Sequence, residues 1–198
     1  MPKAFLRHRG STLMEHAVAY LLGHAGRVLV GLSGDRLEEG RSLVGSDHVL
    51  CLPGGTTKQD TIGLLLAAAD APVVIVHDAS QLDPAAGLMP RVLAGIEGAD
   101  ACVPVTVHPV RGSALLTGSD GWMEAVVPRE RLAFSHTPQV YWRESLVAAY
   151  AQAVREDWHE SGIYALIHRW GGRVRTVAGD PEHRKITWPD DLALLEQS

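Results

Sequence analysis

The feature that most constrains this fold is a repeated alternation of short apolar runs with segments of helical length. Apolar runs occupy residues 27–32, 48–52, 72–77 and 101–105. Segments with helical patterns precede or separate them, at residues 12–24, 35–43, 58–69 and 89–96. Strands that are apolar throughout and joined by helices belong to parallel sheets buried on both faces. The sequence therefore predicts an α/β fold with a doubly wound, mostly parallel sheet.

The pattern changes between residues 105 and 133. Short runs are broken there by Pro109, Gly112, Gly118 and Gly121, which is more typical of a hairpin than of another strand–helix unit. Two helices, a strand and a short terminal helix are then expected, at 146–157, 162–170, 172–177 and 189–195. No repeat or interdomain linker is visible, so residues 1–198 are expected to form a single domain with a hairpin arm at about 105–133.

Composition excludes several classes of protein. The chain has 198 residues, a formal net charge of −5 and only two cysteines. Its longest apolar run, residues 64–69, is far shorter than the roughly 20 residues of a membrane helix, and residues 1–10 lack the apolar stretch of a secretory signal. An acidic chain lacks the positive charge that nucleic-acid surfaces use. We therefore expect a cytoplasmic protein with neither nucleic acid nor membrane as a partner.

Three polar segments lie where ligands of such sheets bind, beyond the carboxyl ends of strands. In residues 53–61, the pair Gly54–Gly55 leads into a helix, either as a ligand-binding loop or as an ordinary glycine turn with a threonine cap. Asp78 follows the third apolar run and suits a metal ion, a ribose hydroxyl or a helix cap. Lys185 is one of only three lysines, against 15 arginines, and is either a functional cation or a solvated side chain.

Several short motifs follow one another in order from residue 2 to residue 196. They are Pro2-Lys3-Ala4-Phe5-Leu6, the glycine pair with Lys58 and Thr61, His77-Asp78-Ala79, Pro128-Arg129-Glu130-Arg131-Leu132, Thr137-Pro138-Gln139, and Lys185-Ile186-Thr187-x-Pro-x-Asp-Leu-Ala-Leu. Each motif alone is weak, but the ordered set is specific. It resembles the cytidylyltransferases of the 2-C-methyl-D-erythritol 4-phosphate class, a group that includes the ribitol 5-phosphate enzymes.

The resemblance implies a Rossmann-like nucleotidyltransferase that forms a homodimer through the hairpin arm. It implies Mg²⁺-dependent transfer of CMP from CTP to an alcohol phosphate, most simply 2-C-methyl-D-erythritol 4-phosphate of the isoprenoid precursor pathway, with release of pyrophosphate. Lys3 and Lys185 would be the catalytic cations. The resemblance also implies nucleotide contacts by Gly54, Gly55, Lys58, Thr61 and Asp78, a metal contact by Asp78, and substrate contacts by Thr187 and, across the dimer, Arg129.

This chain departs from the family pattern at several places. The family begins with a strand and a glycine-rich loop ahead of its proline–lysine pair, whereas this sequence opens at Met1-Pro2-Lys3. We therefore expect the first, central strand to be absent from the sheet, unless the true start lies upstream. Gln81 replaces an arginine, and residues 158–162 alter a carboxylate pattern. The alternatives are a non-catalytic paralogue that binds nucleotide or protein, an enzyme for another polyol phosphate or phosphonate, and a sugar-1-phosphate nucleotidyltransferase.

Overall fold

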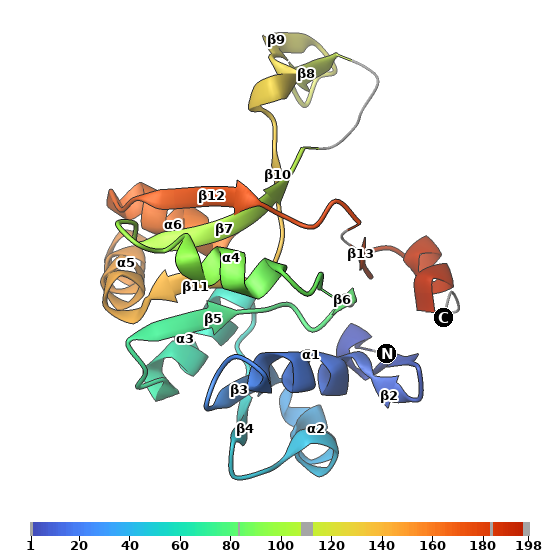
Figure 1. The fold of residues 1–198 in the computed structure, drawn as a ribbon. Coiled ribbons are helices and arrows are strands. Elements are labelled where there is room, and N and C mark those ends of the chain that lie inside the picture. Colours follow the sequence, from blue (N-terminus) through green and yellow to red (C-terminus); the bar gives the residue numbers. More distant parts are fainter. Residues whose placement is uncertain (1, 83, 108–112, 183, 196–198) are drawn as a thin grey trace.

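The computed structural model describes residues 2–82, 84–107, 113–182 and 184–195. Its largest sheet has five strands (Figure 1), with β7 at its centre. β12 pairs with one edge of β7, and β10 and β11 pair with the other, while β5 continues the sheet beside β11. The bounds of these strands are Val73–Val76 for β5, Ala101–Thr106 for β7, Phe134–Ser135 for β10, Gln139–Trp142 for β11 and Val174–Ala178 for β12.

Strand direction confirms the predicted fold class and adds two antiparallel strands, β10 and β11. β12 runs parallel to β7, and β11 runs antiparallel to both β5 and β7, so β5, β7 and β12 share one direction. β10, which has only two residues, is missing from our sequence prediction, and so is β11. β11 contains only four residues between Pro138 and the first residue of the next helix, too few for its apolar residues to separate from the helical pattern.

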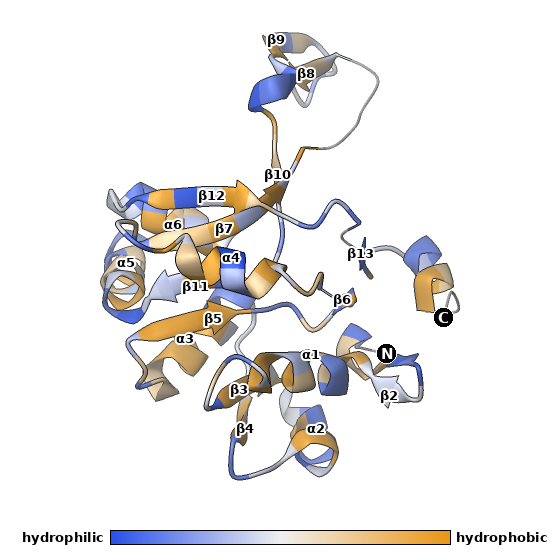
Figure 2. Ribbon diagram, viewed as in Figure 1, coloured by the Kyte–Doolittle hydropathy of each residue, from blue (hydrophilic) through white to orange (hydrophobic). Residues whose placement is uncertain are grey.

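Helices cover both faces of this sheet, as expected for a doubly wound fold. Neighbouring residues of a strand point to opposite faces. Accordingly, Tyr141 packs with α5 (Arg143–Glu156), α6 (Ile163–Trp170) and Leu66 of α3 (Lys58–Ala68), whereas Val140 packs with α4 (Leu88–Ala94). Figure 2 shows β5 and β7 as predominantly hydrophobic between these layers.

Two other strands form a separate parallel pair, β3 (Val28–Leu32) and β4 (Val49–Pro53). α1 (Leu13–Leu22) and α2 (Leu37–Val44) pack against them around Met14, Val18 and Cys51. No strand within the described residues hydrogen-bonds β3 to the five-stranded sheet. The sheet is thus interrupted, in agreement with the strand that the sequence predicts to be absent.

The described part of the segment between residues 105 and 133 contains the predicted hairpin. β8 (Ala114–Thr117) and β9 (Met123–Val127) pair antiparallel and project away from the body of the molecule (Figure 1). Pro109 and Gly112, two of the residues that indicate a hairpin in the sequence, lie outside the described residues. The base of the arm includes a 3-10 turn, η3 (Arg129–Arg131).

Two further antiparallel pairs lie near the chain ends and were not predicted: β1 (Arg7–His8) with β2 (Ser11–Thr12), and β6 (Gln81–Leu82) with β13 (Arg184–Lys185). Two residues per strand are too few for a periodic signal. The predicted terminal helix is a 3-10 helix, η4 (Pro189–Leu195), and the other short turns are η1 (Lys3–Phe5) and η2 (Gly34–Arg36). Among the described residues, no helix has both the length and the apolar character needed to span a bilayer.

Candidate active site

The site is built around Asp78, two residues beyond the end of β5. Its backbone N–H donates to the Thr137 hydroxyl over 3.1 Å, which ties the loop after β5 to the segment before β11. The backbone N–H and the hydroxyl of Ser80 both donate to Asp78 Oδ1, over 3.2 and 2.9 Å. These contacts fix one carboxylate oxygen and turn the other toward the neighbouring elements.

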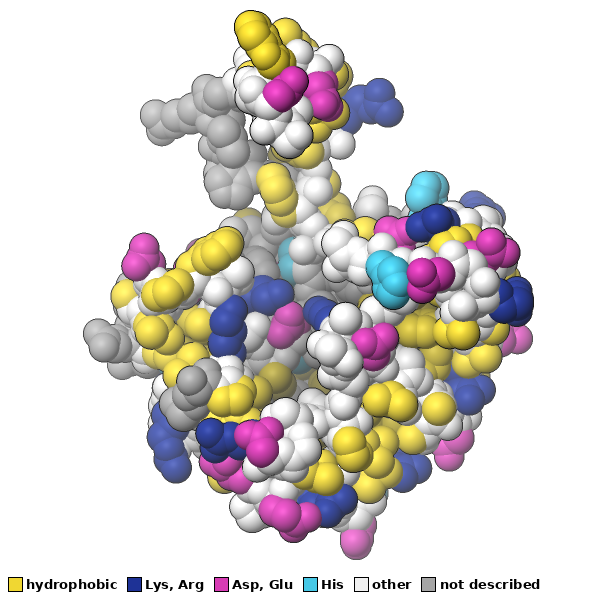
Figure 3. Space-filling view, turned by 180° about the vertical axis from the view of Figure 1, so that it is seen from behind, with side chains coloured by type: hydrophobic (Ala, Val, Ile, Leu, Met, Phe, Trp, Pro, Cys, Tyr) yellow, Lys and Arg dark blue, Asp and Glu magenta, His cyan; other side chains and the backbone are white. Residues whose placement is uncertain are grey.

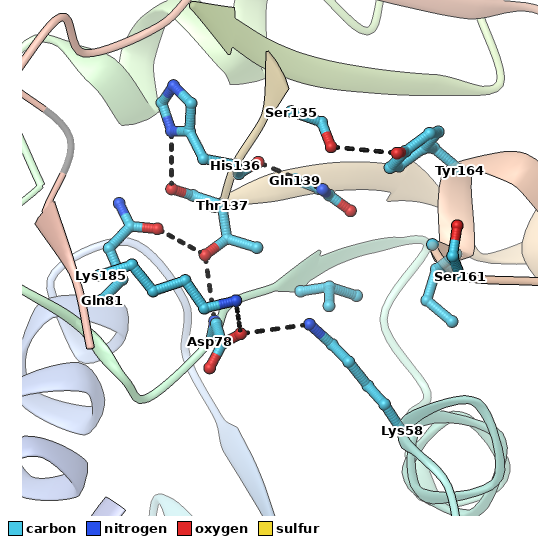
Figure 4. Close-up of a pocket in the computed structure, with 13 residues that line it drawn as sticks. Lys58, Asp78, Gln81, Ser135, His136, Thr137, Gln139, Ser161, Tyr164 and Lys185 are labelled. Carbon is cyan, nitrogen blue, oxygen red and sulfur yellow. Dashed lines mark hydrogen bonds and ion pairs between the residues drawn. The ribbon is translucent and has the colours of Figure 1, made fainter. Parts of the chain in front are cut away.

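Two lysines from distant parts of the chain meet at that other oxygen. Lys185 Nζ lies 2.7 Å from Asp78 Oδ2 and Lys58 Nζ lies 3.3 Å from it (Figure 4). Lys58 is the first residue of α3, whose start is held by reciprocal bonds between Thr57 and Asp60. Lys185 is held in β13, opposite Gln81 of β6. Three separate segments therefore bring two ammonium groups onto one carboxylate.

The charge state of Asp78 follows from these neighbours. Burial alone would raise the pKa of its carboxyl group, but Lys58, Lys185 and the Ser80 hydroxyl outweigh burial and hold that pKa well below its usual range. The carboxylate is therefore ionised at every pH at which the protein would work. Two ammonium groups against one carboxylate leave an excess of one positive charge.

A cavity of about 150 Å³ opens beside this cluster. Figure 3 shows basic and acidic side chains gathered in a hollow below the arm. The lining is mostly polar and comes from five segments: Lys58, Val76, Asp78, Gln81, Ser135, His136, Thr137, Gln139, Ser161, Gly162, Ile163, Tyr164 and Lys185. The Thr137 hydroxyl donates to Gln81 Oε1 over 2.7 Å, and the Ser135 hydroxyl donates to Tyr164 Oη over 3.1 Å.

The two ends of the described chain meet next to this cavity. Lys3 Nζ donates to the carbonyl oxygen of Thr187, only two residues after Lys185. His8 and the carbonyl of Leu195 form a second hydrogen bond of 3.2 Å between the ends. Lys3 does not line the cavity itself. The structure thus places Lys3, Thr187 and Lys185 in one region although residues 3 and 185 are separated by nearly the whole sequence.

The glycine loop has a local structural explanation. Gly55 N–H donates to Thr61 Oγ1, and the Thr61 hydroxyl donates to the Thr57 carbonyl. A Cβ atom on Gly55 would lie 2.4 Å from Cβ of Asp60, so only glycine fits there. Gly54, Gly55 and Thr61 do not line the cavity, whereas Lys58 of the same loop does.

Arg129 stands apart from the other predicted residues. It is exposed in η3, at the base of the arm, and does not line the cavity of its own chain.

A metal ion would find one carboxylate here. No group of three or more His, Cys, Asp or Glu side chains suited to a metal occurs among the described residues. Both oxygens of Asp78 are already engaged, so a cation could bind only by displacing a lysine. Mg²⁺ is commonly held by one or two carboxylates together with substrate phosphates and water. The single carboxylate of Asp78 fits a divalent cation whose other ligands would be phosphates and water.

Most residues of the cavity lining have no site prediction from the sequence. The Thr137-Pro138-Gln139 motif was noted only as part of the resemblance, yet Thr137 and Gln139 both line the cavity. Gln81 was noted only as a departure from the family. Ser161 lies in the segment 158–162, which departs from the family pattern, and Tyr164 has no local signal, because its approach depends on how α6 packs against the sheet.

A doubly wound α/β domain with a cationic polar cavity beyond the strand ends suits a nucleotidyltransferase, an enzyme that transfers a nucleotidyl group. The family model for 2-C-methyl-D-erythritol 4-phosphate cytidylyltransferase matches residues 1–197. The chain belongs to this family of CTP-dependent nucleotidyltransferases, which confirms the resemblance predicted from its motifs.

Individual members of this family are similar to the chain over nearly its whole length. A 2-C-methyl-D-erythritol 4-phosphate cytidylyltransferase of Thermus thermophilus is 36% identical over 196 residues, covering 98% of this chain and 87% of its own length. One from Deinococcus radiodurans is 34% identical over 198 residues, covering 98% and 81%. A crystal structure of the enzyme from Thermus thermophilus superposes with a TM-score of 0.83 at 35% identity, covering 98% of this chain and 92% of that one.

Proposed function

We propose that this protein transfers CMP from CTP to 2-C-methyl-D-erythritol 4-phosphate and releases pyrophosphate. The observation that carries the proposal is the pair of ammonium groups on Asp78, beside a polar cavity. Their excess positive charge suits a phosphate group, because charge-assisted hydrogen bonds to phosphate are among the stronger polar contacts. Family membership supports both the reaction and the two substrates.

The lysines have separate roles in this proposal. Lys185 contacts the phosphate at which transfer occurs, and Lys3, held on the Thr187 carbonyl, contacts the triphosphate. In phosphoryl-type transfers, positioning and the stabilisation of developing negative charge supply most of the catalysis. Lys58 adds a third ammonium group at the junction between the cavity and the nucleotide loop.

The size of the cavity favours the alcohol phosphate as its occupant. At about 150 Å³ it is smaller than the roughly 300 Å³ or more of most small-molecule sites, and too small for a whole nucleotide. The cytidine would lie on the adjacent loop, against Gly54, Gly55 and Thr61, with Asp78 at its ribose or metal side. Thr187 supports the alcohol phosphate beside Lys185.

Three further features complete the proposal. Mg²⁺, bound by the triphosphate and Asp78, would neutralise charge on the phosphates. A homodimer would form through the arm, so that Arg129 contacts the substrate phosphate in the other subunit. The chain would act in the cytoplasm as a single domain of residues 1–198, without nucleic acid or membrane as a partner.

The test is pyrophosphate release with CTP, Mg²⁺ and 2-C-methyl-D-erythritol 4-phosphate, with D-ribitol 5-phosphate as a second acceptor. We expect turnover with the erythritol phosphate and a loss of at least about 100-fold in kcat for Lys185→Ala, since removal of one group that stabilises transition-state charge commonly costs that much.

Arg155→Ala is the control, because Arg155 is an exposed cation on α5 outside the cavity. Its turnover should equal that of the parent. Equal turnover by Lys185→Ala and the parent would refute the role of Lys185, and an inactive parent with both acceptors would refute the proposed reaction.

A further inference from the structure

His136 is a buried histidine in the wall of the cavity. It lies between β10 and β11, and only 6% of its surface is exposed. Its Nε2 lies 3.3 Å from the backbone nitrogen of Asp180, which belongs to the segment that leads from β12 to β13. Its Nδ1 lies 3.3 Å from the carbonyl oxygen of Thr137 (Figure 4). Both ring nitrogens therefore face backbone groups of the chain.

These two backbone groups require the same form of the imidazole. An amide N–H only donates, so Nε2 must offer a lone pair to Asp180, and a carbonyl oxygen only accepts, so Nδ1 must carry the hydrogen. Burial lowers the pKa of His136 below its ordinary value of 6.5, although Asp180 and the bond to Thr137 act in the opposite direction. The imidazole is therefore neutral near pH 7, with its proton on Nδ1.

The imidazole also fits closely against Gly179, the first residue beyond β12. A Cβ atom at Gly179 would overlap Nε2 of His136 and would lie 2.9 Å from the carbonyl oxygen of Val105, so only glycine allows the chain to cross the ring there. The N–H of Gly179 donates to that same carbonyl oxygen over 2.8 Å. The chain that leaves β12 is thus held by β7 on one side and by His136 on the other.

Asp180 connects this contact with Lys185. Its carboxylate accepts from the backbone N–H groups of Ala85 and Glu182, over 3.2 and 2.9 Å. Ala85 follows β6 and Glu182 precedes β13, so one carboxylate ties together the two segments that pair as β6 and β13. Lys185 belongs to this pair, and from it the ammonium group reaches Asp78. The position of Asp180 therefore affects the position of the Lys185 ammonium group.

We propose that His136 is a positioning residue, whose neutral imidazole holds Asp180 and thereby keeps Lys185 in place beside the cavity. In this role it acts through Lys185 and not on the substrate. A proton on Nε2 would turn an N–H toward the N–H of Asp180 and break the hydrogen bond between them. The effect on turnover rests on the proposed function, whereas the hydrogen bond between His136 and Asp180 does not.

The charged and titratable groups around His136 are known for the described residues. Asp180 acts on its pKa directly, and the ionisable side chains of the described cavity lining are Lys58, Asp78, Tyr164 and Lys185. His136 is the one histidine of that lining. Histidine is the side chain whose ordinary pKa puts its charge change between pH 5 and pH 8, so the role of His136 can be tested by a pH profile.

The test is the pH dependence of kcat/KM for CMP transfer in the parent and in His136→Gln, with each profile divided by its own value at pH 8. Glutamine can accept from Asp180 and donate to Thr137, but it does not titrate. The substrate phosphate, with a second pKa of about 6, affects both proteins alike. We expect the ratio of the parent profile to the variant profile to be constant above pH 7 and to fall about twofold or more by pH 5.

Two further variants complete the experiment. His168→Gln is the matched control, because His168 is exposed on α6 and does not line the cavity, and its normalised profile should equal that of the parent. His136→Leu removes the acceptor for Asp180 and should lower kcat about tenfold or more at every pH, because Lys185 is then misplaced. A His136→Gln profile that coincides with the parent profile would overturn the inference, and so would parental kcat in His136→Leu.

A spectroscopic measurement separates this inference from the proposed reaction. At pH 7, the imidazole ¹⁵N signals of His136 in the parent should show a protonated Nδ1 and an unprotonated Nε2. As the pH is lowered, the backbone amide signals of Asp180 and Lys185 should shift with the midpoint of the imidazole, and in His136→Gln they should show no shift with that midpoint. Amide signals that do not follow the imidazole refute the role of His136, whatever the activity. Amide signals that follow it in a protein that releases no pyrophosphate would refute the reaction and support the positioning role.

Discussion

Asp78 shows how one residue links the fold to the chemistry. Its carboxylate accepts from Ser80 on one oxygen and from two ammonium groups on the other. If one member of a largely buried group of charges is removed, the remaining charges lose their partner. The free energy of unfolding then falls by more than the ion pair had contributed. Asp78 therefore stabilises the local structure while it holds Lys58 and Lys185 in place for an incoming phosphate.

We expect Asp78→Asn to lower the free energy of unfolding at pH 7 by about 1–2 kcal/mol, less than a fully buried pair because the lysines are partly exposed. The pKa of Asp78 is lower in the folded protein than its ordinary value of 3.8. The contribution of the ionised Asp78 to the free energy of unfolding is therefore complete above pH 3.8. It is lost as the pH falls from there toward the folded-state pKa. Urea unfolding between pH 7 and pH 3 measures the difference.

Asp35→Asn is the control for that measurement. Asp35 is exposed, and its ion pair with Arg36 is long, at 3.8 Å. Its effect should stay below about 0.5 kcal/mol. A parent and an Asp78→Asn variant of equal stability at pH 7 would contradict the assignment.

At the scale of secondary structure, the pair β3–β4 is the least supported part of the sheet. Its two strands hydrogen-bond only to each other among the described strands, whereas β7 pairs with three strands and β11 with two. A two-stranded sheet is marginal by itself, so β3 and β4 depend on packing against α1, α2 and α3. Gly31 permits the last of these, because its missing Cβ leaves room for Thr61.

This difference predicts the pattern of amide exchange. Opening β3–β4 disrupts one ladder, while opening β7 disrupts three, so amides of β3 and β4 should exchange at least about tenfold faster than those of β7 and β11 after correction for intrinsic rates. Hydrogen exchange followed by NMR at neutral pH measures this. Equal protection of the two groups would show that β3–β4 opens only with the whole domain.

At the scale of the whole molecule, the arm exposes apolar surface that its own chain does not cover. Leu115 and Val126 face each other across the hairpin and are 49% and 67% exposed, and Trp122 in the turn is 76% exposed. Contiguous exposed apolar surface commonly marks a contact with another molecule. This supports the proposed homodimer, in which the arm of one copy reaches the other.

We expect the parent to sediment as a dimer at micromolar concentration and the double variant Leu115→Glu/Val126→Lys to sediment as a monomer. Opposite charges across the hairpin preserve the arm while removing its apolar surface. Turnover should fall with the dimer, since Arg129 would then lack a second subunit. Val154→Glu is the control, because Val154 is an 80% exposed apolar residue on α5. A monomeric parent would contradict the proposal.

The sequence alone determined the order of the main elements and the family. The apolar runs at β3, β4, β5 and β7 were long enough to carry a periodic signal, and the motifs around Asp78 and Lys185 are contiguous in the chain. The expectation that one central strand is absent agrees with the sheet, because β3 pairs only with β4 among the described strands.

Only the tertiary structure decided which side chains meet. The approach of Lys58 and Lys185 to Asp78, and of Lys3 to Thr187, depends on pairings between segments far apart in the chain, such as β6 with β13. A local sequence pattern shows which residues of one segment are buried, and so predicts a helix or a strand. A site depends on the distances between segments, and those distances are established only when the segments pack together.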